Sequence, residues 1–347
     1  MNKIELYQEI LKIAPYRSNQ SDYRAVLSEV LAKYRALLGE LDSNQFDPNQ
    51  SRNGVLKDVD NTIEKLKEIA KNSFKGFPST AYIQLSNLLK THRANLIWNE
   101  IQSETPFYRM RHVEGPRINL GYKQMFHVPI SKRGLVKTQR YSTPGYPCLY
   151  LGESIYGCWE EMQRPVMSQC WVSLLKNQRA IELLDLRIPT VEQFIREFSR
   201  YTQVFPLIIA CMIPALNSDD VYKPEYIVPQ LIFEWIIKNK KYGIYYTSSH
   251  KNGDFDFPTD KFNNLAIPVK QPLAKTDYCP TIARDFKISN PLNNEIEQLR
   301  ESYTLDAGVY GNEENVQEEL NRNYNTSDFG QLERRLVHYD DLHLMNE

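Results

Sequence analysis

The spacing of apolar residues changes once along the chain, near Pro106, and that change constrains the fold more than any other feature. Residues 1–103 repeat apolar side chains at steps of three and four, which predicts amphipathic helices that pack as an all-α bundle. From residue 104 onward, short runs rich in aromatic and β-branched residues are divided by Gly and Pro, as in strands. The expected fold class is therefore α+β (mixed α/β), with a helical bundle before a mixed domain.

The individual elements follow from the same patterns. Four helices are expected in the first part, of which the second begins behind Ser21 as N-cap, the third covers 56–69 and the fourth covers 80–101. Later helices are expected over 154–163, 190–201 and 225–239, between strands over 107–113, 123–130, 147–152, 169–175, 241–249 and 265–269. A chain of 347 residues exceeds the usual size of one core, so we expect domains at 1–103 and 104–273, with an acidic, partly ordered tail at 274–347.

Composition narrows the class of protein. The start of the chain lacks an apolar signal-peptide core, and the longest apolar run, 207–213, is too short to cross a bilayer. Five cysteines without a C-x-x-C pair favour a reducing, cytoplasmic location, and six scattered histidines predict no metal site. The formal net charge is −1, but the acidic tail leaves a mildly basic body, which favours an anionic small ligand and is too diffuse for nucleic acid.

One stretch, residues 140–162, combines a turn, a buried strand and a helix with polar groups at their joints. Ser154 can cap the helix, and the adjacent amide groups suit a phosphate-bearing ligand. At 100° per residue, Glu161 borders the apolar helix face while Glu160 points nearly opposite, so Glu161 is the carboxylate that can reach a pocket. An ion pair with a nearby arginine is the structural alternative for such a carboxylate.

A second stretch, residues 226–249, reads as an amphipathic helix carrying Gln230 and Glu234, followed by a strand that ends in Thr-Ser-Ser. Strand ends and the loops after them often hold ligand groups, although hydroxyl residues there more often form turns. No G-x-G-x-x-G or P-loop pattern occurs, so the sequence does not support a Rossmann-type dinucleotide site.

Taken in order, these stretches resemble the RES family, which is named for its arginine, glutamate and serine and includes NAD-consuming toxins. The resemblance covers residues 104–270 and rests on FYRMR at 107–111, RYSTPGYPCLYLG at 140–152, the helix ending in EEM, GIYYTSS at 243–249 and NLAIPV at 264–269. It implies an ADP-ribosyltransferase-like fold and, as site residues, Arg140, Tyr150, Glu161 and Ser248, with Arg109 and Gln230 as further binding residues. The chain reads Thr-Gln-Arg-Tyr at 138–141 where Gly-Gly-Arg-Trp is commoner, and the pairs Glu160-Glu161 and Ser248-Ser249 leave one residue open in each assignment.

The resemblance implies loss of nicotinamide from NAD, with NAD as substrate and no cofactor. Phosphate as acceptor would make the chain an NAD phosphorylase, water an NAD glycohydrolase, and a macromolecule an ADP-ribosyltransferase, in that order of preference. A domain that only senses a nucleotide is the non-enzymatic alternative. A toxin of this kind would have an antitoxin or regulatory partner and is expected to form a homo-oligomer. If the acidic tail covers a basic pocket, removing residues 274–347 should raise activity; a solvated extension is the preferred interpretation.

Overall fold

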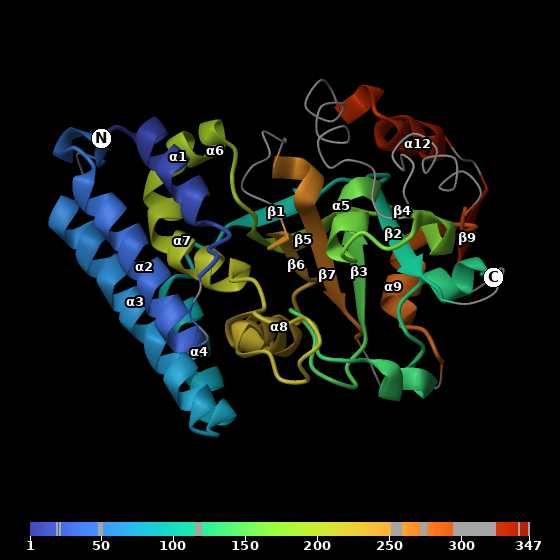
Figure 1. Cartoon of the computed structure of the whole chain (residues 1–347), viewed down its shortest axis with the longest axis horizontal. Helices are drawn as coiled ribbons and strands as arrows, with labels where there is room; N and C mark the ends of the chain where they lie inside the picture. Colours follow the sequence, from blue (N-terminus) through green and yellow to red (C-terminus); the bar gives the residue numbers. More distant parts are fainter. Residues whose placement is uncertain are drawn as a thin grey trace. The chain divides into compact units, whose positions relative to one another are not determined.

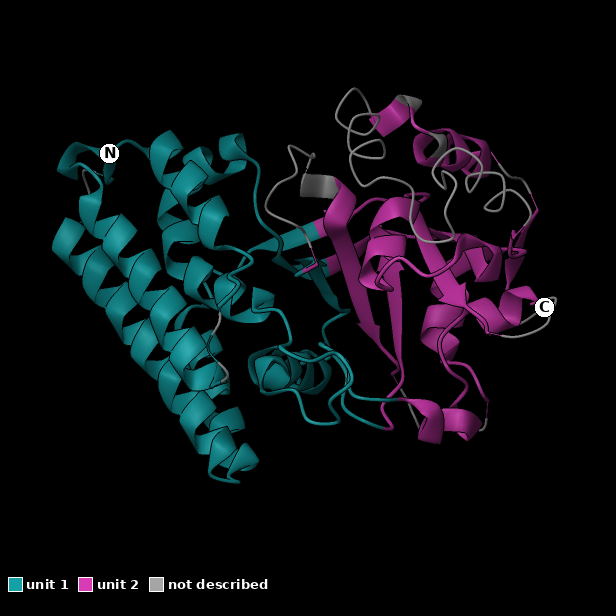
Figure 2. Cartoon of the chain, viewed as in Figure 1, with its two compact units in different colours: residues 1–99, 137–144, 183–249 teal, residues 100–136, 145–182, 250–347 magenta. Residues whose placement is uncertain are grey.

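The computed structural model describes residues 1–18, 20, 22–47, 51–114, 120–250, 259–270, 276–293, 324–338 and 341–345. They form two compact units, shown in different colours in Figure 2. Unit 1 comprises residues 1–99, 137–144 and 183–249, and unit 2 comprises residues 100–136, 145–182 and 250–347. The presence of helices together with parallel and antiparallel strands confirms the α+β class.

Unit 1 is built on helices whose apolar faces meet. Its first four are α1 (Lys3–Ile13), α2 (Tyr23–Glu40), α3 (Arg52–Phe74) and α4 (Pro78–Thr91), and α2, α3 and α4 lie side by side (Figure 1). Three more follow later in the chain, α6 (Val191–Arg196), α7 (Phe198–Met212) and α8 (Ile227–Lys238). Helix α7 is apolar on almost every side and packs against α2 and α3, which makes it the centre of this core.

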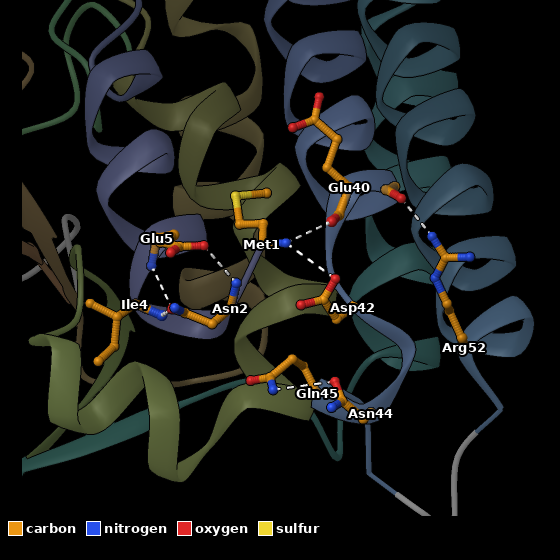
Figure 3. A network of polar contacts seen from close by, with 10 residues as sticks. Met1, Asn2, Ile4, Glu5, Glu40, Asp42, Asn44, Gln45 and Arg52 are labelled. Atoms are coloured by element: carbon orange, nitrogen blue, oxygen red, sulfur yellow. Dashed lines mark hydrogen bonds and ion pairs between the residues drawn. The ribbon is translucent and has the colours of Figure 1, made fainter.

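The N-terminus of α1 is tied to the end of α2 (Figure 3). The Met1 ammonium donates to the Glu40 carbonyl oxygen at 3.3 Å and to the Asp42 carboxylate at 3.2 Å. Asn2 and Glu5 form a capping box at the start of α1. A positive charge beside the last carbonyl groups of α2 complements the helix dipole, so this contact stabilises both helix ends.

The strands of unit 1 follow the order β1 (Trp98–Ile101), β5 (Ile181–Leu186), β6 (Ile244–Thr247), and β5 pairs with β6 in parallel. Two differences from the expected elements lie here. The helix expected over 80–101 ends at Thr91, where His92 forms its C-cap, and the chain continues into β1. Helix α2 takes its N-cap from Asp22, while Ser21 lies outside the described residues.

Unit 2 contains an antiparallel sheet in the order β7-β3-β2-β4-β8-β9. Three of its strands match expected ones closely: β2 (Pro106–His112), β3 (Cys148–Gly152) and β4 (Cys170–Asn177). Strand β7 (Asn263–Pro268) was expected as the last strand, but β8 (Phe286–Ser289) and β9 (Leu342–Leu344) follow it. The run 123–130, also expected as a strand, instead forms parts of two 3-10 helices, η2 (Tyr122–Met125) and η3 (Ile130–Leu135).

One face of this sheet is covered by α5 (Ile155–Glu161) and α12 (Asp328–Val337). Phe329 of α12 is fully buried, with its ring 5.4 Å from that of Tyr156 and 5.8 Å from that of Trp159. Glu333, also buried, accepts hydrogen bonds from the Ile155 amide and the Tyr324 hydroxyl, each at 2.6 Å. The C-terminal segment therefore completes the core around α5.

The compact units divide the chain differently from the expected domains 1–103, 104–273 and 274–347. Unit 1 includes residues 183–249 because α7 and α8 pack against the N-terminal helices. Residues 276–293, 324–338 and 341–345 are not a separate tail, since they supply α9 (Pro280–Asp285), β8, α12 and β9 to unit 2. The helical patterns at 295–303 and 317–320 lie outside the described residues. No helix in the described ranges combines the length and apolar character that a membrane span requires.

A buried histidine joins two loops of unit 2. The Cys279 amide donates to His127 Nε2 at 2.9 Å, so this nitrogen is unprotonated, and Nδ1 donates its hydrogen to the Val128 carbonyl oxygen at 2.8 Å. His127 is 1% exposed, and its burial lowers the pKa to about 4. The neutral imidazole is therefore the form that fits the folded chain.

This histidine predicts an acid-dependent loss of stability. In the unfolded chain His127 is protonated near its ordinary pKa of 6.5, whereas in the folded chain it is protonated only near pH 4. Because the unfolded state binds the proton first, stability is complete above the higher value and falls as the pH drops toward the lower one, by about 3 kcal/mol. Urea unfolding across this range should show a weaker pH dependence for His127→Gln than for the wild type. His338→Gln, at an exposed position, serves as control; equal pH dependence in all three proteins would contradict the assignment.

Candidate active site

Helix α5 carries the two adjacent glutamates, and the structure gives them different surroundings. Ser154 caps the helix by accepting from the Gly157 amide at 2.8 Å and donates to the Lys261 carbonyl oxygen at 2.6 Å. After the helix, Gln163 and Arg164 adopt positive φ angles of 61° and 54°, which turns the chain back. Arg164 then forms an ion pair with Glu160, at 2.9 Å between Nη2 and Oε1.

This arrangement corrects the helix-face expectation. Glu160, expected to point away from the core, is the more buried carboxylate, with a side chain 8% exposed against 30% for Glu161. The returning chain covers the side of α5 that periodicity alone assigns to solvent. The ion pair considered as the structural alternative for Glu161 is thus formed by Glu160, and Glu161 remains the more accessible of the two.

Glu161 is held by a neutral donor. Asn264, on β7, donates from Nδ2 to Glu161 Oε1 at 2.8 Å. His250 Nε2 lies 3.9 Å from Oε2, within ion-pair distance when the ring is protonated. Sequence reasoning did not select Asn264, although it is the first residue of the NLAIPV stretch. The carboxylate therefore has a defined orientation without a permanently charged partner in these contacts.

Arg109, at the centre of β2, is the second charged residue of unit 2 among the predicted site residues, after Glu161. Its Nη1 donates to the Tyr150 carbonyl oxygen of β3 at 2.8 Å, while its buried Nε has no hydrogen-bond partner within the described ranges. Burial, followed by the charge of Arg111, lowers the pKa of Arg109 to about 10, so the guanidinium is cationic at neutral pH. A phosphate or carboxylate oxygen is the group that such an Nε–H favours.

The pKa of the Cys158 thiol on α5 is affected by the charges of both Glu161 and Arg109. Burial, and next the charge of Glu161, raises the pKa of this thiol to about 12, while Arg109 acts in the opposite direction. Tyr150 is half-buried on β3, where it pairs with Ala266 of β7. Unit 2 thus brings together three of the six predicted site residues, Arg109, Tyr150 and Glu161.

The other three predicted residues, Arg140, Gln230 and Ser248, belong to unit 1. Arg140 is 9% exposed and donates from Nη1 to the carbonyl oxygens of Cys211 and Ile213, at 2.8 and 3.0 Å. Cys211 lies in the last turn of α7, whose carbonyl groups have no partner within the helix, so Arg140 caps this helix end. Its Nη2 donates to the Ser249 hydroxyl at 2.6 Å, while the neighbouring Ser248 is fully buried.

Gln230 fixes the turn that carries Arg140. Its Nε2 lies within donating distance of three oxygens, those of the Thr138 side chain and of the Gln139 and Ser142 carbonyl groups, at 2.9 to 3.2 Å. Gln139 and Ser142 also form an isolated β-bridge across the turn. Helix α8 therefore positions residues 139–142 through one amide, a role that its sequence pattern did not reveal.

These contacts predict that Arg140 contributes to stability. Replacing it with Met would leave two carbonyl groups and a hydroxyl without their donor, and should lower the free energy of unfolding by about 3 kcal/mol. Chemical unfolding of Arg140→Met measures this, with Arg196→Met as control because Arg196 is a largely exposed arginine of α6. An Arg140 variant with wild-type stability and weakened NAD binding would instead indicate a residue that acts only on ligand.

Among the residues that the structure describes, no group of three His, Cys, Asp or Glu side chains could hold a metal ion. Chemically, a half-exposed carboxylate can stabilise a developing cation, and a guanidinium in the same unit can bind an anion.

Comparisons with known proteins give one informative match. Over 354 residues, covering 93% of this chain and 77% of the other, the chain is 27% identical to a Bacillus subtilis (strain 168) protein named "Putative toxin YopC". No family model matches the chain, and no solved structure matches it. Because the match spans nearly the whole chain, both compact units have counterparts in that protein.

Proposed function

We propose that this chain is a toxin that depletes NAD by breaking the bond between nicotinamide and ribose. Two independent lines support it: the similarity to a protein named as a toxin, and the resemblance of residues 104–270 to the RES family. The observation that carries the proposal is the environment of Glu161, a half-exposed carboxylate oriented by an amide while its neighbour Glu160 is neutralised by an arginine.

The chemistry of NAD cleavage matches this environment. Nicotinamide leaves a cationic pyridinium as a neutral molecule, so its departure needs no general acid. Positive charge develops on the ribose instead, and a fixed carboxylate nearby stabilises it. We assign this role to Glu161, which accepts a hydrogen bond from the neutral amide of Asn264.

Arg109 would bind the pyrophosphate. NAD carries two phosphate groups, and the guanidinium of Arg109, which is cationic at neutral pH, is a planar group of donors that phosphate oxygens accept. Tyr150 would place its ring against nicotinamide or ribose. The binding roles of Arg140, Gln230 and Ser248 that the resemblance implies stay predictions, and the contacts described above give Arg140 and Gln230 structural roles as well.

The acceptor decides the reaction class, and we rank phosphate first, water second and a macromolecule third. Purified protein incubated with NAD, with and without phosphate, is resolved by chromatography for nicotinamide and the ribose product. Phosphate-dependent release indicates phosphorolysis, release without phosphate indicates hydrolysis, and label transferred to macromolecules indicates an ADP-ribosyltransferase. No nicotinamide release under any condition would overturn the proposal and favour a nucleotide-sensing module.

A toxin that depletes NAD must be restrained in the cell that makes it. We therefore extend the proposal to a partner protein that inhibits the chain, as the word toxin in the name of the related protein suggests. Co-expression of the chain with the product of an adjacent gene, followed by measurement of growth and cellular NAD, tests this extension. Growth arrest that no adjacent gene relieves would contradict it.

A further inference from the structure

Two neighbouring asparagines on β7 each donate to a glutamate of unit 2. Asn263 donates from Nδ2 to Glu153 Oε2 and Asn264 from Nδ2 to Glu161 Oε1, both at 2.8 Å. The two asparagines are 4% and 5% exposed. Successive residues of a strand project to opposite faces of the sheet. The two asparagines therefore make the same kind of hydrogen bond on opposite faces. Glu161 belongs to the candidate site, and Glu153 does not.

The sheet leaves space for Asn264 at one glycine. Gly152 of β3 lies opposite Asn264 in the β3–β7 register. A Cβ atom at position 152 would come within 3.1 Å of Asn264 Oδ1 and 2.6 Å of Cys158 Sγ. Asn264 and α5 therefore occupy the volume that any larger residue would fill, and the amide is confined beneath the helix that carries Glu161.

The type of donor matters for the charge of the glutamate. Arg164 neutralises Glu160 through an ion pair, whereas the Asn264 amide orients Glu161 without adding a compensating charge. Within the described residues, Asn264 donates to Oε1, and Oε2 lies on the side of His250, whose Nε2 is 3.9 Å away. A carboxylate that must stabilise a cation requires both fixed geometry and a retained negative charge.

We propose that Asn264 is the positioning residue of Glu161, holding one carboxylate oxygen so that the other faces the ribose carbon from which nicotinamide departs. This inference rests on the proposed NAD cleavage. Among the residues that the structure describes, the titratable groups recorded beside Glu161 are His250 and the Cys158 thiol. Asn264 itself need not touch the substrate.

The matched pair of asparagines supplies the test. Asn264→Asp keeps the shape but replaces the donor with a second carboxylate, and Asn264→Ala removes the donor without adding charge. Both should lower kcat for nicotinamide release by about 10²-fold with KM little changed, because a small misplacement of a reacting group has an effect of this size. In Asn264→Asp, the acidic limb of the pH profile of kcat should also move to higher pH, since two adjoining carboxylates do not ionise together easily.

Asn263→Asp and Asn263→Ala are the controls, and thermal unfolding of all four variants separates stability from turnover. If Asn264→Asp does not fold, the comparison of kcat between Asn264→Ala and Asn263→Ala tests the inference. Equal kcat in the Asn264 variants and the wild type, or equal loss in the Asn263 variants, would overturn the inference while NAD cleavage stands. A wild-type protein that releases no nicotinamide would overturn the proposed function, and this inference with it.

Discussion

Replacing Glu161 with Gln is expected to lower kcat for nicotinamide release by roughly 10²–10³-fold while NAD still binds. The amide has nearly the shape of the carboxylate and can still contact Asn264, but it lacks the charge that stabilises the developing ribose cation. Chromatographic assay of nicotinamide gives kcat, and calorimetric titration of the inactive variant with NAD gives the Kd. The largest functional effect in the chain should therefore come from an isosteric change at a half-exposed position.

Glu160→Gln is the matched control, because it makes the same chemical change one residue earlier. Glu160 is buried in an ion pair with Arg164, so its loss should lower stability and leave turnover per folded molecule close to wild type. The two variants thus predict opposite patterns. Loss of turnover in Glu160→Gln together with normal turnover in Glu161→Gln would reassign the catalytic carboxylate.

The largest effect on stability is expected from Phe329→Ala. Phe329 is fully buried between Tyr156 and Trp159, and truncating a buried phenylalanine lowers the free energy of unfolding by about 3–5 kcal/mol. Urea unfolding followed by tryptophan fluorescence measures the change. Arg334→Ala, at an exposed position of the same helix, should have little effect. Similar stabilities for the two variants would mean that α12 does not belong to the core of unit 2.

The same packing reverses an expectation about the C-terminal segment. Removing residues 274–347 was expected to raise activity if an acidic tail covers a basic pocket. In the structure, the deletion removes β8 and the helix that packs on α5, so we expect loss of folded protein rather than activation. The segment is acidic in composition, but its buried residues have a structural role.

Local patterns were sufficient for elements whose signal lies within the element. The α2 and α3 helices, strands β2, β3 and β4, and helix α5 were predicted because periodicity and bounding turns mark them. Strands β8 and β9 were missed, since they lie in a polar region and pair with strands far away in the sequence. The run 123–130 has strand composition but forms 3-10 helices around the buried His127.

Some residues of the candidate site were predicted from the sequence, and others were missed or misplaced. Glu161 was selected from helix geometry, yet the geometry misplaced Glu160, because periodicity carries no information on the chain that turns back after α5. Asn264 was missed since its partner lies 103 positions away and a strand asparagine has no distinctive pattern. For Arg140, sequence could identify an anion-binding residue type but not the helix end that its side chain caps.

The hydrogen bond from the Ile155 amide to Glu333 determines when, during synthesis, helix α5 can complete its packing. These residues are separated by 178 positions, so the first turn of α5 lacks its carboxylate acceptor until residue 333 has been synthesised. Domains generally fold as their sequence emerges. Here the helix that carries Glu161 cannot reach its final packing before Glu333 is made, and an activity located on it would begin only after that.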